Sequence, residues 1–305
     1  MDGVKVLRFS HTYTSTVWGG EDILRRYRRD DAPKPCSESW EISAHPAGRS
    51  VVRGGKFDGV PLDELASRFG AALVGKKAGD AAKFPLLFKI IDARLPLSVQ
   101  VHPNEQTAKL TGGEPKSEAW YVLGASPDAM LYAGLRTPVG AETLRDAARK
   151  GDAIADFVKR IPVSDGDFLY IPGGTPHAIG SGLMIYEVQQ SSDTTYRLYD
   201  WGRVGADGKP RELHVEKALA AMNTEAAPPL VRRGSVETPY FTIKDIPLSE
   251  PLRLVADGSS FIAVFVASGA VSEAAAGTSL LLPAVGGELV LEPSAPNTRV
   301  IVTTL

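Results

Sequence analysis

Gly166-Asp-Phe-Leu-Tyr-Ile-Pro-Gly-Gly-Thr-Pro-His177 is the stretch of sequence that decides the fold. Its apolar segment Phe168–Ile171 predicts a short strand, which runs into a tight Pro-Gly-Gly turn. Proline fixes the entry to such a turn, and glycine lets the backbone reverse sharply. The turn delivers His177 from its far end, where an imidazole nitrogen can bind a metal ion. The alternative interpretation is a hairpin whose histidine has no such role.

A second stretch, Leu97-Ser-Val-Gln-Val-His-Pro103, gathers polar side chains on one face of a strand. Because side chains alternate along a strand, Ser98, Gln100 and His102 share a face, opposite Leu97, Val99 and Val101. Pro103 then ends the strand. A polar face within an apolar protein is exposed either to water or to a binding site.

The best-placed carboxylate for such a site is Glu118, which opens the apolar segment Ala119–Leu123 and can point inward. Glu105 is closer to His102 in sequence, but it falls in a predicted turn or helix start. Two imidazoles, one carboxylate and one amide oxygen form a donor set that suits Zn²⁺ and also accepts Mn²⁺, Fe²⁺ or Co²⁺. Without a thiolate, the set indicates an open catalytic site for one divalent ion.

The composition excludes several classes of protein. The 305 residues carry 34 basic and 36 acidic side chains, a net charge of −2, with no basic block of the kind that binds nucleic acid. The single cysteine, Cys36, cannot form an internal disulfide. The N-terminus shows no secretory signal, and no apolar run approaches the roughly 20 residues that cross a bilayer. We therefore expect a cytoplasmic protein that binds neither nucleic acid nor membranes.

Short segments rich in β-branched and aromatic residues predict a mainly β fold, in which the strands close into a barrel or pack as a sandwich. The predicted strands are Val4–Phe9, Trp40–Ser43, Leu86–Ile91, Leu97–His102, Ala119–Leu123, Phe168–Ile171, Leu183–Gln190 and Tyr196–Tyr199. Apolar residues at helical spacing predict three amphipathic helices on the outside of the sheet. These helices are Pro61–Gly70, Ala141–Phe157 and Val215–Met222.

The composition changes at Asn223–Gly234, where prolines and charges follow a predicted helix. We expect a connector there, between a catalytic domain of residues 1–225 and a smaller β domain of residues 235–305. The second domain has no histidine or cysteine, so we expect it to be metal-free. Its predicted strands are Phe241–Ile246, Phe261–Ala267, Ser279–Leu282, Glu288–Leu291 and Thr298–Thr303. The spacing from Gly166 to Pro172 recurs from Gly277 to Pro283, either by coincidence or because the second domain is also barrel-like.

The glycine, proline and histidine spacing that ends at His177 matches the second motif of the cupin β-barrel family, except that Ser181 stands where the motif usually ends in Asn. The first cupin motif usually has a His-x-His pair, whereas here the pair is Gln100-x-His102. More widely, the chain resembles the type I mannose-6-phosphate isomerases (phosphomannose isomerases) in their shorter bacterial form. The matching stretches cover most of residues 1–220 and are residues 18–20, 38–43, 84–89, 97–103, 116–118, 174–180 and 192–201.

The resemblance implies a cupin-type barrel (jelly roll) with a few peripheral helices, and zinc held at Gln100, His102, Glu118 and His177. It also implies interconversion of mannose 6-phosphate and fructose 6-phosphate through an enediol. The resemblance implies a catalytic arginine at Arg197, which stays cationic and either stabilises the enediolate or binds the phosphate. We expect Lys116 and Asp193 as further catalytic residues and Ser98, Lys89 and Glu38 as substrate-binding residues, with the Ser98 hydroxyl bonded to a phosphate oxygen.

The sequence leaves three questions open. The group that removes the proton is a metal-bound water, Asp193, Glu38 or Lys116, because sequence gives no distances. The alternative functions are another metal-dependent cupin enzyme, such as a dioxygenase or decarboxylase, and a non-catalytic sugar-binding cupin. The oligomeric state is not predicted.

Overall fold

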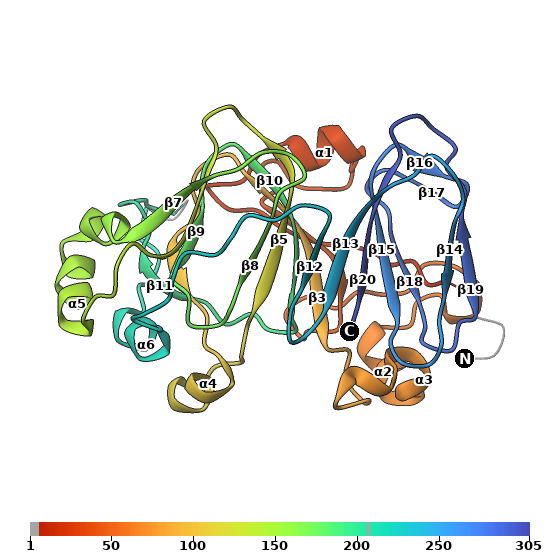
Figure 1. The fold of residues 1–305 in the computed structure, drawn as a ribbon, viewed down its shortest axis with the longest axis horizontal. Coiled ribbons are helices and arrows are strands. Elements are labelled where there is room, and N and C mark those ends of the chain that lie inside the picture. The colour runs from red at the N-terminus through yellow and green to blue at the C-terminus, as the bar shows by residue number, and fades with distance from the viewer. Residues whose placement is uncertain (1–5, 206–207) are drawn as a thin grey trace.

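The computed structural model describes residues 6–205 and 208–305 and consists mainly of antiparallel strands (Figure 1). Its layers lie side by side from left to right in Figure 1: helices, two facing sheets, and then the C-terminal sheets. We call the six-stranded sheet, of order β1-β2-β3-β10-β5-β8, the central sheet, and the five-stranded sheet of order β11-β4-β9-β6-β7 the outer sheet. The metal-binding candidates lie between these two sheets.

The strands fall into two facing sheets and a C-terminal part. The central sheet comprises β1 (Thr12–Thr14), β2 (Glu38–Ser43), β3 (Leu86–Ala93), β10 (Leu183–Gln190), β5 (Glu118–Ala125) and β8 (Phe168–Ile171). The outer sheet comprises β11 (Tyr196–Tyr199), β4 (Val99–Val101), β9 (His177–Ile179), β6 (Met130–Leu135) and β7 (Val158–Pro162). The C-terminal part comprises β12 (Ser235–Glu237), β13 (Thr242–Pro247), β14 (Leu252–Val255), β15 (Ile262–Ser268), β16 (Ala270–Val271), β17 (Ala274–Ala275), β18 (Ser279–Leu282), β19 (Glu288–Leu291) and β20 (Arg299–Thr304).

The space between the central and outer sheets is apolar at one end and polar at the other. Ile91, Val122 and Ile185 of the central sheet pack against Leu131 and Ile179 of the outer sheet. Because the side chains of a strand alternate, the same inner face of the central sheet also carries charged residues farther along its strands. The polar end of this space contains the candidate site.

The C-terminal sheet, of order β12-β13-β20-β15-β18, packs on the other face of the central sheet. Tyr186 of β10 stacks on Phe265 of β15, with ring centroids 4.4 Å apart and ring planes 8° apart. The buried carboxylate of Glu41 in β2 also accepts a hydrogen bond from Ser279 of β18 at 2.9 Å. Residues from both parts of the chain therefore share one buried core.

Two of the helices cover the far face of the outer sheet, and others lie beside the central and C-terminal sheets (Figure 1). Leu144 of one helix and Leu219 of another pack with Val99 and Val101, the outward-facing residues of β4. The helices are α1 (Asp22–Tyr27), α2 (Leu62–Phe69), α3 (Ala71–Val74), α4 (Glu105–Thr111), α5 (Ala141–Arg149) and α6 (Val215–Ala221), with short 3₁₀ helices at Gly55–Phe57, Lys76–Ala78 and Gly151–Asp156. Asn104 begins α4 as part of a capping box with Thr107. These helices are peripheral, as the sequence predicts.

The expected fold class is confirmed, with corrections to individual elements. In the described part of the chain the strands form separate facing sheets rather than one closed barrel. The helix predicted at Ala141–Phe157 is wrong in its second half, because Gly151 has a φ of 76° and the chain continues as a 3₁₀ helix. The strand predicted at Val4–Phe9 begins outside the described residues, and its described end makes only isolated bridges, through Leu7 and Phe9.

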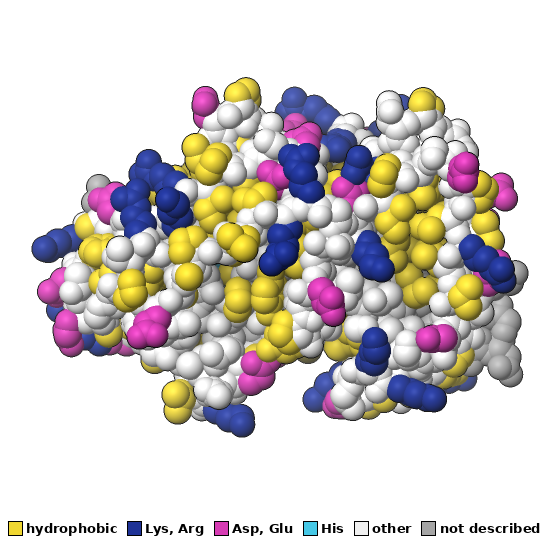
Figure 2. Space-filling model, in the orientation of Figure 1, with side chains coloured by type: hydrophobic (Ala, Val, Ile, Leu, Met, Phe, Trp, Pro, Cys, Tyr) yellow, Lys and Arg dark blue, Asp and Glu magenta, His cyan; other side chains and the backbone are white. Residues whose placement is uncertain are grey.

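The surface carries mixed charges. On the face shown in Figure 2, basic and acidic side chains are interspersed among hydrophobic ones. Within residues 6–205 and 208–305, no helix is long and apolar enough to cross a membrane.

Candidate metal centre and active-site cavity

A row of three polar side chains crosses the outer sheet. Gln100 of β4 lies opposite Arg197 of β11 on one side and opposite His177 of β9 on the other. Residues directly opposite in neighbouring strands point to the same face of a sheet. The pairing of β4 with both neighbours therefore aligns the two predicted metal ligands and the predicted catalytic arginine.

The candidate metal ligands converge on one point. One nitrogen each of His102 and His177 and one oxygen of Glu118 all lie within 4.8 Å of one another. The three side chains are almost completely buried, with about 1% of each exposed. Glu118 comes from the central sheet and His177 from the outer sheet, so the facing of the two sheets creates the cluster.

Backbone carbonyls orient both imidazole rings. The carbonyl of Thr194 accepts a hydrogen bond from Nδ1 of His102 at 2.7 Å, and the carbonyl of Thr175 accepts one from Nδ1 of His177 at 2.8 Å. Each Nε2 is thereby left as a lone-pair donor directed at the cluster. Burial, reinforced by the Lys116 ammonium, holds the pKa of His102 well below its usual value and lowers the pKa of His177 to about 4. Both rings are neutral at pH 7, as metal binding requires.

Gln100 is the fourth predicted ligand. Its Nε2 lies 3.4 Å from Nε2 of His102 and 3.3 Å from Nε2 of His177. Its Oε1 accepts a hydrogen bond from the Ser98 hydroxyl at 3.0 Å. A half-turn of the amide would direct Oε1 at the cluster and let Nε2 donate to Ser98, because the two orientations of an amide have nearly the same shape.

The residues present fit a divalent metal ion. Both oxygens of Glu118 are buried, and Oε1 accepts no hydrogen bond within the described structure, whereas Oε2 lies 2.6 Å from the Lys116 ammonium. A buried carboxylate in this state is costly unless a cation compensates it. Two neutral imidazoles, one carboxylate and one amide oxygen provide that compensation through a zinc-type ligand set. Among the described residues, His102, Glu118 and His177 are the one group of three or more His, Cys, Asp or Glu side chains that lie close enough together to hold a metal ion.

A cavity of about 200 Å³ opens beside the cluster. Eight of the ten predicted site residues line it, and the other two, His102 and His177, lie against Gln100 behind them. The eight are Glu38, Lys89, Ser98, Gln100, Lys116, Glu118, Asp193 and Arg197. Separated segments of sequence therefore meet at one place, as expected, while the individual roles of the residues remain predictions.

Lys89 and Lys116 point into this cavity rather than to the surface. The Lys89 ammonium lies 3.6 Å from Glu38 and 4.5 Å from the centre of the Trp40 ring. Burial alone would lower the pKa of Lys116, but the Glu118 and Glu187 carboxylates raise it above the usual value. The raised pKa keeps the Lys116 ammonium positive beside the cavity.

Glu187 is a site residue that sequence reasoning missed. Its side chain is 3% exposed and lies in the cavity, where Oε2 accepts a hydrogen bond from the Trp120 indole at 3.0 Å. Oε1 is buried and accepts no hydrogen bond from any described residue. Burial and the neighbouring Glu118 raise the pKa of Glu187. The available signal was a single carboxylate within the otherwise apolar start of Leu183–Gln190.

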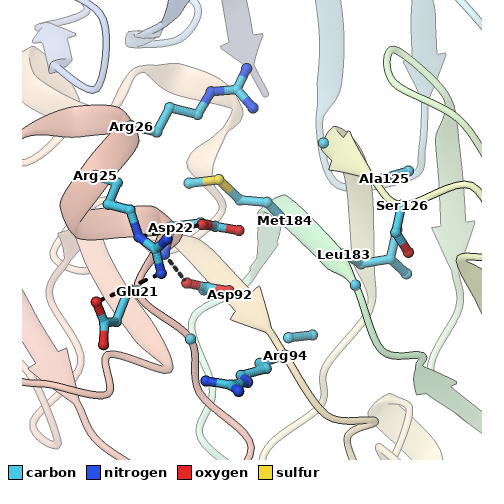
Figure 3. Close-up of a pocket in the computed structure, with 14 residues that line it drawn as sticks. Glu21, Asp22, Arg25, Arg26, Asp92, Arg94, Ala125, Ser126, Leu183 and Met184 are labelled. Carbon is cyan, nitrogen blue, oxygen red and sulfur yellow. Dashed lines mark hydrogen bonds and ion pairs between the residues drawn. The ribbon is translucent and has the colours of Figure 1, made fainter.

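The cavity is not the largest in the protein. A cavity of about 810 Å³ lies at the opposite end of the central sheet, beside α1 (Figure 3). There Arg25 pairs with Glu21, and the Asp92 carboxylate accepts a hydrogen bond from the backbone of Asp22 at 2.6 Å. Its lining includes three acidic side chains, of Glu21, Asp22 and Asp92, and three basic ones, of Arg25, Arg26 and Arg94, so the formal charges balance.

Comparison with known proteins agrees with this geometry. The model of the phosphomannose isomerase type I catalytic domain matches residues 6–122. The chain is 41% identical to mannose-6-phosphate isomerase of Streptococcus mutans over 238 residues, which is 74% of each protein. It is 39% identical to mannose-6-phosphate isomerase ManA of Bacillus subtilis, over 73% of this chain and 69% of that protein. The chain belongs to the type I phosphomannose isomerase family.

Solved structures extend the family likeness to the whole chain. The mannose 6-phosphate isomerase structure from Bacillus subtilis superposes with a TM-score of 0.86 at 28% identity, covering 99% of this chain and 100% of that one. A structure of mannose 6-phosphate isomerase bound with zinc and yttrium has the same fold, with a TM-score of 0.73 at 18% identity over 98% and 99% of the two chains.

Proposed function

We propose that this protein is a zinc-dependent isomerase that interconverts mannose 6-phosphate and fructose 6-phosphate through an enediol. The observation that carries the proposal is the buried cluster of His102, Glu118 and His177 beside a cavity lined with lysine and arginine. Family membership supports the substrate, and the nitrogen and oxygen donor set favours zinc among divalent ions.

A metal ion in this cluster would act as a Lewis acid, worth several kcal/mol, toward the oxygens on C1 and C2 of the sugar. Four side chains are assigned to hold it: Gln100, His102, Glu118 and His177. The hydroxyl of Ser98 contacts Gln100, which favours a role in orienting this ligand over the phosphate contact expected from sequence.

We assign the proton transfer between C2 and C1 to Glu187. Among the candidate carboxylates, Asp193 is exposed, and the side chain of Glu38 is 18% exposed although, like Glu187, it accepts one hydrogen bond from an indole. By contrast, Oε1 of Glu187 is buried, unbonded within the described structure and next to the cavity. A raised pKa makes a carboxylate a stronger base and suits it to exchange a proton with carbon. Lys116, whose ammonium is 3.9 Å from Glu187, would stabilise its ionised form.

Arg197 and Lys89 are assigned to stabilise negative charge on the substrate. Arg197 lies beside Gln100 in the outer sheet, so its guanidinium would face the end of the sugar that carries the developing charge. Lys89 lies across the cavity in the central sheet and pairs with Glu38. Asp193 and Glu38 are then left to bind sugar hydroxyls.

The two alternatives are disfavoured for different reasons. A redox cupin enzyme would need open positions for O₂, and three histidines are usual there, whereas Gln100 replaces one of them here. A non-catalytic sugar-binding protein would have no need of a buried metal-binding set next to Glu187 and Lys116. We further propose that residues 1–225 form the catalytic unit, that residues 235–305 are metal-free, and that the enzyme works in the cytoplasm.

A coupled assay tests the function directly. Purified protein is supplied with mannose 6-phosphate, and fructose 6-phosphate formation is followed with and without a chelator, alongside elemental analysis. We expect one zinc per chain, turnover that the chelator abolishes, and recovery when zinc is returned. Chelator-resistant turnover would refute the metal dependence, and the absence of any turnover by zinc-loaded protein would refute the isomerase assignment.

A further inference from the structure

Two arginines, Arg197 and Arg211, line the active-site cavity. Arg211, from the segment between β11 and α6, lines the cavity with Arg197. Nε of Arg197 is buried and has no hydrogen-bond partner among the described residues. Burial and the nearby Arg211 both lower the pKa of Arg197, which indicates that the two cations repel each other. Such a pair is better tolerated when an anion lies between the two groups.

A buried carboxylate holds Arg211 in this position. Asp200, whose side chain is 6% exposed, accepts two hydrogen bonds from Arg211, at 2.7 Å from Nε and at 2.6 Å from Nη2. Asp200 also pairs with Arg203, which is turned to the carbonyl of Pro96 instead of the cavity. One carboxylate thus pairs with two guanidinium groups, of which only Arg211 lines the cavity.

We propose that Arg211, fixed by Asp200, binds the phosphate group of the sugar substrate. This inference rests on the proposed function, and it adds a residue that sequence reasoning did not single out. A guanidinium offers several N–H donors in a planar fork, so Arg211 can keep its two bonds to Asp200 and present a remaining donor to a phosphate oxygen. The phosphate is at the end of the sugar opposite C1 and C2, which suits a group at the rim while Arg197 reaches inward beside Gln100.

The test compares Arg211→Ala with Arg203→Ala, because both arginines pair with Asp200 and only Arg211 lines the cavity. We measure KM and kcat for mannose 6-phosphate, and the inhibition constant of inorganic phosphate. Arg211→Ala should raise KM and the inhibition constant roughly tenfold or more, the loss expected for a hydrogen bond to a charged group, and should change kcat much less. Arg203→Ala should leave both constants within about twofold of wild type, whatever it does to stability.

Arg211→Lys is the second variant, used if Arg211→Ala does not fold. Lysine keeps a positive charge but lacks the planar fork of arginine. The KM and the inhibition constant of this variant should therefore lie between those of wild type and Arg211→Ala. An unchanged inhibition constant for inorganic phosphate in a folded Arg211 variant would overturn the proposal, as would equal losses in the Arg203 and Arg211 variants. If wild-type protein shows no isomerase activity, calorimetric titration with inorganic phosphate still tests the subsite, so the two proposals fail separately.

Discussion

Lys89 and Glu187 lie directly opposite each other in neighbouring strands of the central sheet, with the lysine ammonium 4.0 Å from Oε1 of the glutamate. Trp120 lies opposite Glu187 on its other side and donates to Oε2. This row faces the row of Arg197, Gln100 and His177 in the outer sheet. The active-site cavity is therefore enclosed by one polar row from each sheet.

The first prediction concerns Glu187. Glu187→Gln should keep the fold and the bound metal, because the amide has nearly the same shape, but should lower kcat roughly 10²- to 10⁴-fold through loss of the proton carrier. Steady-state kinetics measures the fall in kcat, and elemental analysis of the same sample measures the retained metal. Glu38→Gln is the matched comparison, since Glu38 lines the same cavity. A larger loss of kcat in Glu38→Gln than in Glu187→Gln would contradict this assignment and identify Glu38 as the base.

The second prediction concerns the metal ligands. His102→Ala or His177→Ala should lose both the metal ion and turnover, with a fall in kcat/KM of roughly a thousandfold or more for a lost Lewis acid. The metal is measured by elemental analysis after dialysis. His45→Ala serves as the control, because His45 bonds Glu114 and lies outside the cluster. Metal at wild-type stoichiometry in either ligand variant would contradict the assignment.

The third prediction separates Arg197 from the ligands. Arg197→Ala should retain the metal but lose most of kcat, on the order of 10²- to 10³-fold, as for removal of one donor that stabilises charge in a transition state. The readouts are metal content, kcat and KM. Near-normal kcat with a raised KM would instead confine Arg197 to binding the phosphate.

The fourth prediction concerns stability and pH. Glu41 is fully buried, and although burial alone would raise its pKa, His11 and Arg29 lower it from 4.5 to about 2. A folded-state pKa below the unfolded value stabilises the protein above pH 4.5, and this contribution is lost as pH falls toward 2. Glu41→Gln should therefore lose about 3 kcal/mol of unfolding free energy at pH 7, and less at pH 3.

Denaturant unfolding of chelator-treated protein at the two pH values measures this loss without interference from metal release. Glu64→Gln, at an exposed position of α2, is the control and should change stability by less than about 0.5 kcal/mol at either pH. A loss in Glu41→Gln that is the same at pH 3 and pH 7 would show that shape rather than charge matters at this position.

The sequence by itself determined much of the local structure of this protein and predicted its candidate metal ligands. The predicted ends of the strands Phe168–Ile171 and Leu183–Gln190 are correct. They follow from neighbouring turn residues, because proline and glycine restrict or free the backbone only within a few residues. The alternation in Leu97–Pro103 placed Ser98 and Gln100 on the cavity side, although Leu97 lies before the strand and packs into the inner core. Strands β6 and β7 were missed because neither alternates clearly: β6 is apolar throughout and contains Gly134, and β7 has two adjacent charged residues, Lys159 and Arg160.

Only the tertiary structure decided which distant side chains meet. The register of β10 with β3 and β5 places Glu187 beside Lys89 and Trp120. The packing of the segment after β11 brings Arg211 to Asp200. Register and docking depend on the packing of whole faces, and shifting a strand by one residue would turn all of its side chains to the opposite face. No short stretch of sequence contains that information, so the ligands could be predicted from motifs, whereas their charged neighbours required the folded chain.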